Sequence, residues 1–334
     1  MTTGSTAADS PPDRTADSPA DGTADSPADG TADSPADGTA DTTAADTTAE
    51  SADDGTGDSD DSGLAWDPGQ YLKYADERGR PFADLLARVG ARDPRYVVDI
   101  GCGPGQLTAG LCARWPDADI EGVDSSVPMI ERAQALRDQG ETAGSTPAAG
   151  ETGRLSFRLG DLRDWRPERP VDVLITNATL QWVPGHVDLL PTWVSYLARD
   201  GWLALQVPGN FDSPSHRTLF ALAAEEPWAR HLTAPVRQRP SAPGPDVYLD
   251  VLAAAGCQVD AWETTYLHVL QGEDAVFEWV KGTGARPVLQ ALPDDVRPDF
   301  EAAYKARLRE AYPPRDVGTV LPYRRVFAVA RRVG

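Results

Sequence analysis

Apolar positions alternate between strand and helix spacing from about residue 95 to residue 207. Short apolar runs of strand length occur at 95–98, 120–123, 155–159, 171–176 and 202–207. Stretches with helical spacing separate them, at 107–112, 129–136 and about 186–198. Strands that alternate with helices through right-handed crossovers build a mostly parallel sheet that is covered on both faces. The pattern therefore predicts a doubly wound α/β fold.

The pattern changes outside this region. A helical stripe from Phe82 to Val89, with Pro81 in its first turn, precedes the first strand. Beyond residue 207, helices are predicted at 215–228, around 248–252, at 273–280 and at 297–311, and long strands at 257–270 and 320–330. The two long strands bring the sheet to seven. We expect the helical insertions between about 208 and 319 to form a lid over a site.

Residues 1–62 have a composition of their own. They contain sixteen acidic residues and one basic residue, Arg14, so this segment carries −15 of the net charge of −21. The octapeptide Thr-Ala-Asp-Ser-Pro-Ala-Asp-Gly occurs three times in tandem at 15–38. A segment without aromatic residues buries too little surface to offset its chain entropy, so we expect a disordered tail ahead of an ordered domain at 63–334. An expendable extension is favoured over a solubilising or partner-binding tail.

Composition excludes several functional classes. The rest of the chain has a net charge of only −6 and predicts no basic face for nucleic acid. No apolar stretch approaches eighteen residues and no signal peptide is evident, so a soluble, cytoplasmic protein without a membrane partner is expected, as a monomer. Cys102, Cys112 and Cys257 lack metal-ligand spacing, and no metal is predicted.

The strongest chemical motif is Asp99-Ile100-Gly101-Cys102-Gly103-Pro104-Gly105, between a predicted strand and a predicted helix. Alternate glycines let the backbone approach a ligand, and the free N–H groups that open the helix favour an anionic group. Asp124 ends the second strand, where a ribose would present its hydroxyls. The spacing G-x-G-x-G differs from the dinucleotide fingerprint and disfavours a dehydrogenase.

Other residues extend this cofactor site. Asp161, followed by Leu162 after the third strand, is placed to accept a hydrogen bond from an exocyclic amine. Further candidates are the helix-capping residue Ser125, Met129 against the adenine, Asn177 at the end of the fourth strand, and Tyr71 and Arg78 folded over the pocket. The fourth strand should lie beside the first, at the switch point where open α/β sheets bind ligands. Gln181, Trp182 and His186 follow this strand and are candidates for the acceptor side.

The glycine turn resembles the first motif of class I S-adenosylmethionine methyltransferases, whose sheets end in an antiparallel strand pair. Motifs across 66–332 make the resemblance closer: Trp66-Asp67-Pro68, Leu180-Gln181-Trp182-Val183-Pro184, Gln206-Val207-Pro208, Pro214-Ser215-His216, Arg286-Pro287 and Tyr312-Pro313. Together they resemble the trans-aconitate 2-methyltransferase family.

The resemblance implies methyl transfer from S-adenosylmethionine to a carboxylate of trans-aconitate, which gives a monomethyl ester and S-adenosylhomocysteine. An ionised carboxylate needs no general base, so no catalytic acid or base side chain is expected. Arg286 offers bidentate geometry for a carboxylate that does not react, and His186, His216, Asn210 and Gln206 are further donors. Methylation of another small acid or small-molecule acceptor, or cofactor binding without turnover, are the alternatives.

Overall fold

The computed structural model describes residues 75–142, 154–233, 236 and 242–333. All of them belong to one compact unit, residues 61–334. The predicted tail at 1–62 and the candidate Tyr71 lie outside the described residues. Arg78 lies in a described helix, but its side chain is outside the description.

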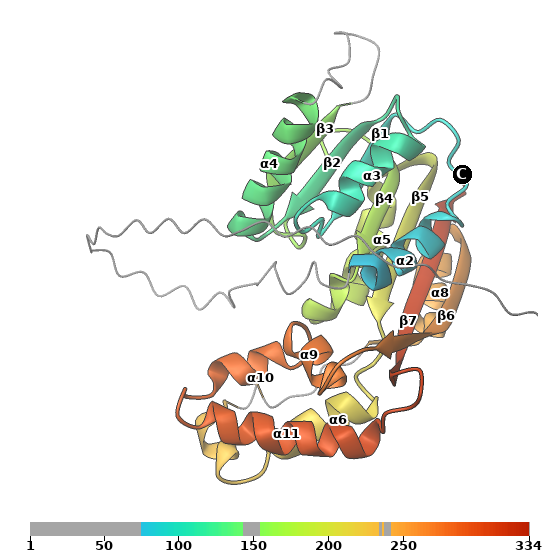
Figure 1. Ribbon diagram of the computed structural model, residues 1–334. Helices are drawn as coiled ribbons and strands as arrows, with labels where there is room; N and C mark the ends of the chain where they lie inside the picture. Colours follow the sequence, from blue (N-terminus) through green and yellow to red (C-terminus); the bar gives the residue numbers. More distant parts are fainter. Residues whose placement is uncertain (1–74, 143–153, 234–235, 237–241, 334) are drawn as a thin grey trace, which may run out of the picture. The chain divides into compact units, whose positions relative to one another are not determined.

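Seven strands form one sheet, in the order β3-β2-β1-β4-β5-β7-β6. Five of them are parallel and were predicted from their apolar runs: β1 (Tyr96–Ile100), β2 (Asp119–Asp124), β3 (Leu155–Leu159), β4 (Val171–Asn177) and β5 (Leu197–Pro208). The long strands β6 (Cys257–Leu270) and β7 (Thr319–Arg332) are antiparallel, and β7 lies between β5 and β6. The predicted doubly wound α/β fold and the position of β4 beside β1 are confirmed (Figure 1).

Helices cover both faces of the sheet. On one face, α2 (Ala75–Leu86) and α3 (Gln106–Arg114) pack around Val97 and Ile120. On the other, α5 (Leu190–Tyr196) and α8 (Pro245–Ala254) pack around Leu174. The helix α4 (Val127–Thr142) packs on Phe157 at the β3 side. These layers hold the carboxyl ends of the parallel strands at one edge, where the predicted ligand residues lie.

The first helix begins earlier than the sequence predicts. It starts at Ala75, so Pro81 lies inside the helix rather than in its first turn. A proline in this position removes one backbone hydrogen bond and favours a helix end. Phe82 and Leu85, which are buried on the sheet, offset that loss.

Two separate stretches of the chain form a second group of helices. It comprises α6 (Pro214–Ala223), the 3-10 turn η3 (Trp228–His231), α9 (Ala275–Lys281), α10 (Arg286–Ala291) and α11 (Arg297–Ala311) (Figure 1). These elements share an apolar cluster around Trp279, Phe300 and Tyr304. The helix α10 was not predicted, and the helix predicted at 215–228 ends at Ala223. Between these two stretches the chain forms α8, which packs on the sheet, and β6, which is a strand of the sheet.

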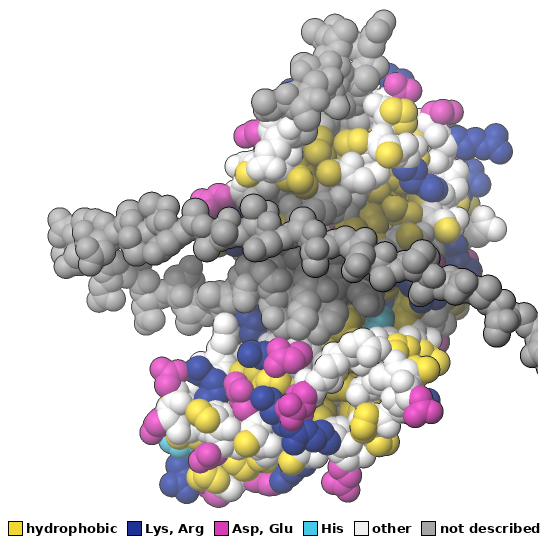
Figure 2. All heavy atoms as spheres, viewed as in Figure 1, with side chains coloured by type: hydrophobic (Ala, Val, Ile, Leu, Met, Phe, Trp, Pro, Cys, Tyr) yellow, Lys and Arg dark blue, Asp and Glu magenta, His cyan; other side chains and the backbone are white. Residues whose placement is uncertain are grey.

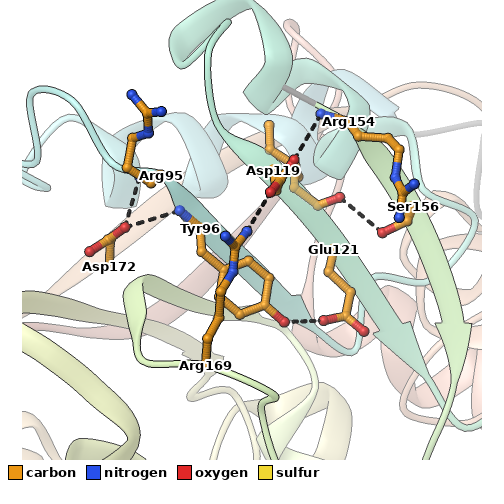
Figure 3. A network of polar contacts seen from close by, with 9 residues as sticks. Arg95, Tyr96, Asp119, Glu121, Arg154, Ser156, Arg169 and Asp172 are labelled. Atoms are coloured by element: carbon orange, nitrogen blue, oxygen red, sulfur yellow. Dashed lines mark hydrogen bonds and ion pairs between the residues drawn. The ribbon is translucent and has the colours of Figure 1, made fainter. Parts of the chain in front are cut away.

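Polar contacts link the strands at the edge opposite the predicted site (Figure 3). The Oδ2 atom of Asp172 accepts the backbone N–H groups of Arg95 at 2.7 Å and Tyr96 at 3.0 Å, which joins β4 to β1. The Tyr96 hydroxyl donates to Glu121 on β2. These contacts fix the register of the strands from the edge where they begin, and leave the carboxyl ends available for a ligand.

Charges of both signs are interspersed over the helical group on the face drawn in Figure 2. Arg309 pairs with Asp274 at 2.7 Å and Arg307 with Glu225 at 2.7 Å. Among the described residues, no helix combines the length and the apolar composition needed to cross a bilayer. Nor do those residues contain a group of His, Cys, Asp or Glu side chains placed to hold a metal ion.

Candidate active site

A cavity of about 610 Å³ lies at the carboxyl ends of β1, β2 and β4 and extends to α9 and α10. Its volume is within the range of small-molecule sites. One half is lined by the turns after β1, β2 and β3, and the other by α6, α9, α10 and the strand β7. Residues of the sheet and of the helical group therefore line one cavity.

The glycine turn after β1 forms the floor of the first half. Gly101, Gly103 and Gly105 have φ angles of +77°, +54° and +85°, a region that side chains disfavour. A Cβ atom would come within 2.1 Å of Thr179 at Gly101 and within 2.7 Å of Phe157 at Gly105. A Cβ atom at Gly103 would meet nothing within 4 Å. Packing therefore requires glycine at the two outer positions, whereas Gly103 faces the open cavity.

Asp124 connects the ends of β1 and β2. Its Oδ2 atom accepts the N–H of Gly103 at 2.9 Å, and its Oδ1 atom accepts the N–H of Ser126 at 2.9 Å. Partial burial raises the pKa of this carboxyl group, and the backbone N–H groups of Ser126 and Gly103 oppose the rise. The side chain is half-buried and lines the cavity, so its remaining lone pairs can accept hydroxyl groups of a ligand.

The predicted residues after β3 and β4 complete this half. Asp161, Leu162 and Asn177 line the cavity, together with Ser125 and the buried Met129. Arg163 binds Asp161, with 3.0 Å between Nε and Oδ1, and these hydrogen bonds lower the pKa of Asp161 and keep it ionised. The Oδ1 atom of Asn177 is buried and has no hydrogen-bond partner among the described residues. An acceptor in this position is available to a ligand.

Asp99 is buried at the end of β1 and accepts a hydrogen bond from the Thr108 hydroxyl at 2.6 Å. Burial raises the pKa of Asp99 to about 6; the Thr108 hydrogen bond opposes this rise, and the charge of Asp124 adds to it. The folded protein therefore holds a proton on Asp99 more tightly than the unfolded chain does.

The raised pKa of Asp99 predicts a loss of stability as pH rises. Because its folded pKa of about 6 lies above its ordinary value of 3.8, the ionised form destabilises the fold, with the penalty growing between about pH 4 and pH 6. We expect Asp99→Asn, whose amide oxygen still accepts from Thr108, to escape a penalty of about 3 kcal/mol. Urea unfolding of both proteins at pH 4, 5, 6 and 7, without ligand, measures it. A constant difference between them across this range would contradict the prediction.

The second half of the cavity presents mainly hydrogen-bond donors. Five predicted residues line it: Gln181, Trp182, Asn210, His216 and Arg286. The Oδ1 atom of Asn210 accepts the backbone N–H of Arg324 at 2.6 Å, which leaves Nδ2 buried without a partner among the residues that the structure describes. The Nδ1 atom of His216 lies 3.2 Å from the Ser213 hydroxyl, so the ring is oriented by protein contacts.

Arg325 on β7 also lines this half, and it is only 4 % exposed. Its guanidinium carbon lies 4.5 Å from the centre of the Tyr323 ring. The acidic side chains of the described lining, Asp99, Asp124 and Asp161, all belong to the first half, where Arg163 pairs with Asp161. The second half has two arginines, Arg286 and Arg325, and no carboxylate among its described residues. The two halves of the cavity thus differ in charge.

Comparison with known proteins identifies the family. A family model described as "Methyltransferase domain" matches residues 74–261. A trans-aconitate 2-methyltransferase of Streptomyces avermitilis is 53 % identical over 270 residues, which cover 80 % of this chain and 97 % of that protein. The chain belongs to the trans-aconitate 2-methyltransferase family. The resemblance of its sequence motifs is thereby confirmed.

Two more relatives with this name agree. The protein from Streptomyces coelicolor is 51 % identical over 80 % of this chain and 86 % of its own length, and the one from Rhodococcus jostii 48 % over 80 % and 99 %. Among solved structures, the YcgJ protein of Bacillus subtilis has a TM-score of 0.52 at 13 % identity, with 77 % of this chain and 99 % of that chain covered. This likeness supports the fold alone.

Two predicted acceptor residues of this methyltransferase are not in the cavity lining. The Nε2 atom of His186 lies 2.7 Å from the Tyr248 hydroxyl and its Nδ1 atom 3.1 Å from the Val183 carbonyl oxygen. Burial lowers the pKa of His186. Gln206 is fully buried on β5, and its Oε1 atom accepts from Arg325 at 3.3 Å. Both side chains point into the core and contact protein groups there, and the Nε2 atom of Gln206 is buried without a hydrogen-bond partner among the described residues. Gly105 is also outside the lining, since it packs against Phe157.

Sequence reasoning missed Arg325, although a signal for it exists. Successive side chains of a strand point to opposite faces, so only one of the adjacent Arg324 and Arg325 can share the face of Tyr323. Arg324 is the outer residue and pairs with Glu263 at 2.6 Å. The buried arginine is therefore the one that shares a face with Tyr323, in the cavity lining.

Proposed function

We propose that this protein transfers a methyl group from S-adenosylmethionine to a carboxylate of trans-aconitate, which yields a monomethyl ester and S-adenosylhomocysteine. The observation that supports it most is the charge division of the cavity. Three aspartates, one of them paired with Arg163, lie in the half beside the glycine turn, and Arg286 and Arg325 lie in the other half, whose described residues include no carboxylate. A polycarboxylate requires cationic donors, and arginine binds carboxylates in bidentate geometry. The name shared by the relatives points to the same acceptor.

The first half of the cavity fits S-adenosylmethionine. The open space beside Gly103 admits a ligand close to the backbone, and the Asp124 carboxylate can accept ribose hydroxyls. The unpaired Oδ1 atom of Asn177 is available to a donor, and Asp161, whose oxygens accept hydrogen bonds from Arg163, lines the same half. When bound, the cofactor supplies a methyl group activated by a positively charged sulfur.

The chain's contribution to the reaction is positioning. The acceptor carboxylate is ionised at neutral pH, so it attacks without a general base. The donors of the second half, Arg286, Asn210 and His216, would hold the acceptor so that one carboxylate oxygen faces the methyl group. Trp279 and Thr283 of the helical group line the same cavity and limit the access of water.

The test is methyl transfer from labelled S-adenosylmethionine to a panel of small carboxylic acids that includes trans-aconitate. Mass spectrometry and NMR of the product identify the ester position. Turnover of trans-aconitate well above that of the other acids supports the proposal. Turnover of a different acid would support the cofactor assignment and contradict trans-aconitate as the acceptor. Tight cofactor binding without turnover of any acid would indicate a binding protein.

Arg286→Ala provides a test of the acceptor half. We expect the KM for trans-aconitate to rise about 10- to 100-fold, because a charge-assisted hydrogen bond is lost. The affinity for S-adenosylmethionine should stay within about twofold, since Arg286 belongs to the other half of the cavity. Lys281→Ala is the matched control, because this exposed lysine of α9 is outside the lining. Equal losses of acceptor and cofactor binding would assign Arg286 a folding role.

A further inference from the structure

Arg325 is held in place by the sheet itself. It lies on β7, which pairs with strands on both sides. Its Nη1 atom donates to the Oε1 atom of Gln206 on β5 at 3.3 Å, and its guanidinium group stacks over Tyr323. Little freedom remains to a side chain that is 4 % exposed and contacts two strands. Its charge is therefore presented to the cavity from a rigid element.

Arg286 reaches the same half of the cavity from the helical group. It is the first residue of α10, whose buried residues Val288 and Leu289 belong to the apolar cluster around Trp279. Arg325 belongs to a strand of the sheet, and Arg286 to a helix whose buried residues pack in the cluster around Trp279. The two guanidinium groups thus face one cavity from two different layers.

The number of charges agrees with a tricarboxylate. One carboxylate of the acceptor must lie at the methyl group, which leaves two that do not react. The second half of the cavity offers two arginines, and its described residues include no carboxylate that would repel an anion. A dicarboxylate has one carboxylate beyond the reacting group and can engage only one of the arginines.

We propose that Arg325 binds one non-reacting carboxylate of the acceptor while Arg286 binds the other, so that a tricarboxylate bridges the sheet and the helical group. Gln206 is the positioning residue that orients Arg325. This inference rests on the proposed function and specifies its selectivity. Acceptors are chosen by the number of their carboxylates, because each missing carboxylate removes one charge-assisted contact between the acceptor and an arginine.

The roles of the two arginines are tested by removing one charge from the protein and one carboxylate from the substrate. The substrates are trans-aconitate and the dicarboxylates in which one of its carboxylates is replaced by hydrogen. We expect Arg325→Gln to lower kcat/KM about 10- to 100-fold for trans-aconitate, and to change it less than about threefold for the dicarboxylate that lacks the carboxylate bound by Arg325. Arg286→Gln should likewise leave kcat/KM nearly unchanged for one dicarboxylate only, the one that lacks the carboxylate bound by Arg286.

The outcomes separate the two proposals. Equal losses with every substrate, no loss with any, or silence of both variants with the same dicarboxylate would overturn the assignment of the arginines. Failure of the wild-type protein to methylate trans-aconitate would instead contradict the proposed function. Thermal unfolding and the affinity for S-adenosylmethionine, measured for each variant, show whether a loss comes from the fold.

Gln206→Glu tests the positioning role with a side chain of nearly the same shape. The added carboxylate pairs with the Arg325 guanidinium group and competes with the acceptor carboxylate for it. The KM for trans-aconitate should therefore rise about 10-fold with little change in kcat. Gln206→Leu removes the hydrogen bond without adding a charge: if Gln206 acts through Arg325, this variant lowers kcat/KM for trans-aconitate in the wild-type background and adds no further loss to Arg325→Gln. Additive losses would contradict that role.

Arg324→Gln is the matched control. This residue is the immediate neighbour of Arg325 but points to the opposite face, where it pairs with Glu263 at 2.6 Å. It removes the same charge from the same strand without touching the cavity lining. The ratio of kcat/KM for trans-aconitate to that for the dicarboxylates should remain as in the wild-type protein. A collapse of this ratio would show that overall charge, and not the position of Arg325, sets the selectivity.

Discussion

Asp124→Ala should weaken the binding of S-adenosylmethionine by about 100- to 10,000-fold. Two hydrogen bonds from ligand hydroxyls to an ionised acceptor contribute about 1.5–3 kcal/mol each, and both are lost together. The substitution also removes the acceptor of the Gly103 and Ser126 backbone N–H groups. The glycine turn then loses its side-chain link to β2, which adds to the loss, and keeps only the backbone hydrogen bonds from Gly101 and Cys102 to Val123. Isothermal titration calorimetry with the cofactor measures the affinity directly.

Two further variants separate the contributions of Asp124. Asp124→Asn keeps one carbonyl oxygen as an acceptor and removes the charge, so its affinity should fall between those of the wild-type protein and Asp124→Ala. Asp119→Ala removes a carboxylate from the opposite end of the same strand, where it pairs with Arg169 outside the cavity lining. Cofactor affinity should not change there. Comparable losses for Asp119→Ala and Asp124→Ala would mean that β2 itself was disturbed, and that no ribose contact is needed.

The parallel half of the sheet was predictable because its strands are buried on both faces. A strand of this kind is a short continuous apolar run, as at Val97-Val98 and at Val173-Leu174-Ile175, and the glycine turn marks where the first one ends. The order of elements then places β4 beside β1. Most of the residues predicted around the glycine turn line the cavity because the carboxyl ends of parallel strands meet at one edge.

Side-chain direction was the main thing that the sequence could not supply. His186 and Gln206 follow or end strands at the ligand edge, as the cavity residues do, yet both point into the core. Their direction depends on partners that are distant in the sequence, Tyr248 and Arg325. The resemblance to a family indicates which residues are present in a motif but not which of them reach the ligand.

The helical group was the least predictable part. α10 has only six residues and begins at Arg286-Pro287, too short a segment for a helical period to stand out. It forms because Val288 and Leu289 pack into an apolar cluster that α6, α9 and α11 complete. Such a helix depends on tertiary contacts more than on its own propensity.

The largest effects on the fold are expected in the glycine turn, where neighbouring positions should fail for different reasons. Gly105→Ala places a methyl group 2.7 Å from Phe157 at a φ of +85°. Backbone strain and overpacking together cost about 2–5 kcal/mol. The melting temperature should therefore fall by about 5–15 °C. Gly103→Ala carries only the backbone strain of about 1–2 kcal/mol, because its methyl group enters open space.

That open space is where the ligand must approach the backbone, so Gly103→Ala should remain folded and lose cofactor affinity by about 100-fold or more, an overpacking cost of about 3 kcal/mol. Gly110→Ala is the control for both, since Gly110 lies exposed within α3 and a Cβ there meets nothing within 4 Å. Alanine in a helix interior should raise stability by about 0.5–1 kcal/mol and leave binding unchanged. Calorimetric scans with and without cofactor test all three. If Gly103→Ala bound the cofactor as the wild-type protein does, the cavity beside the turn would not be the cofactor site, and the charge division argued for the two halves would need another ligand.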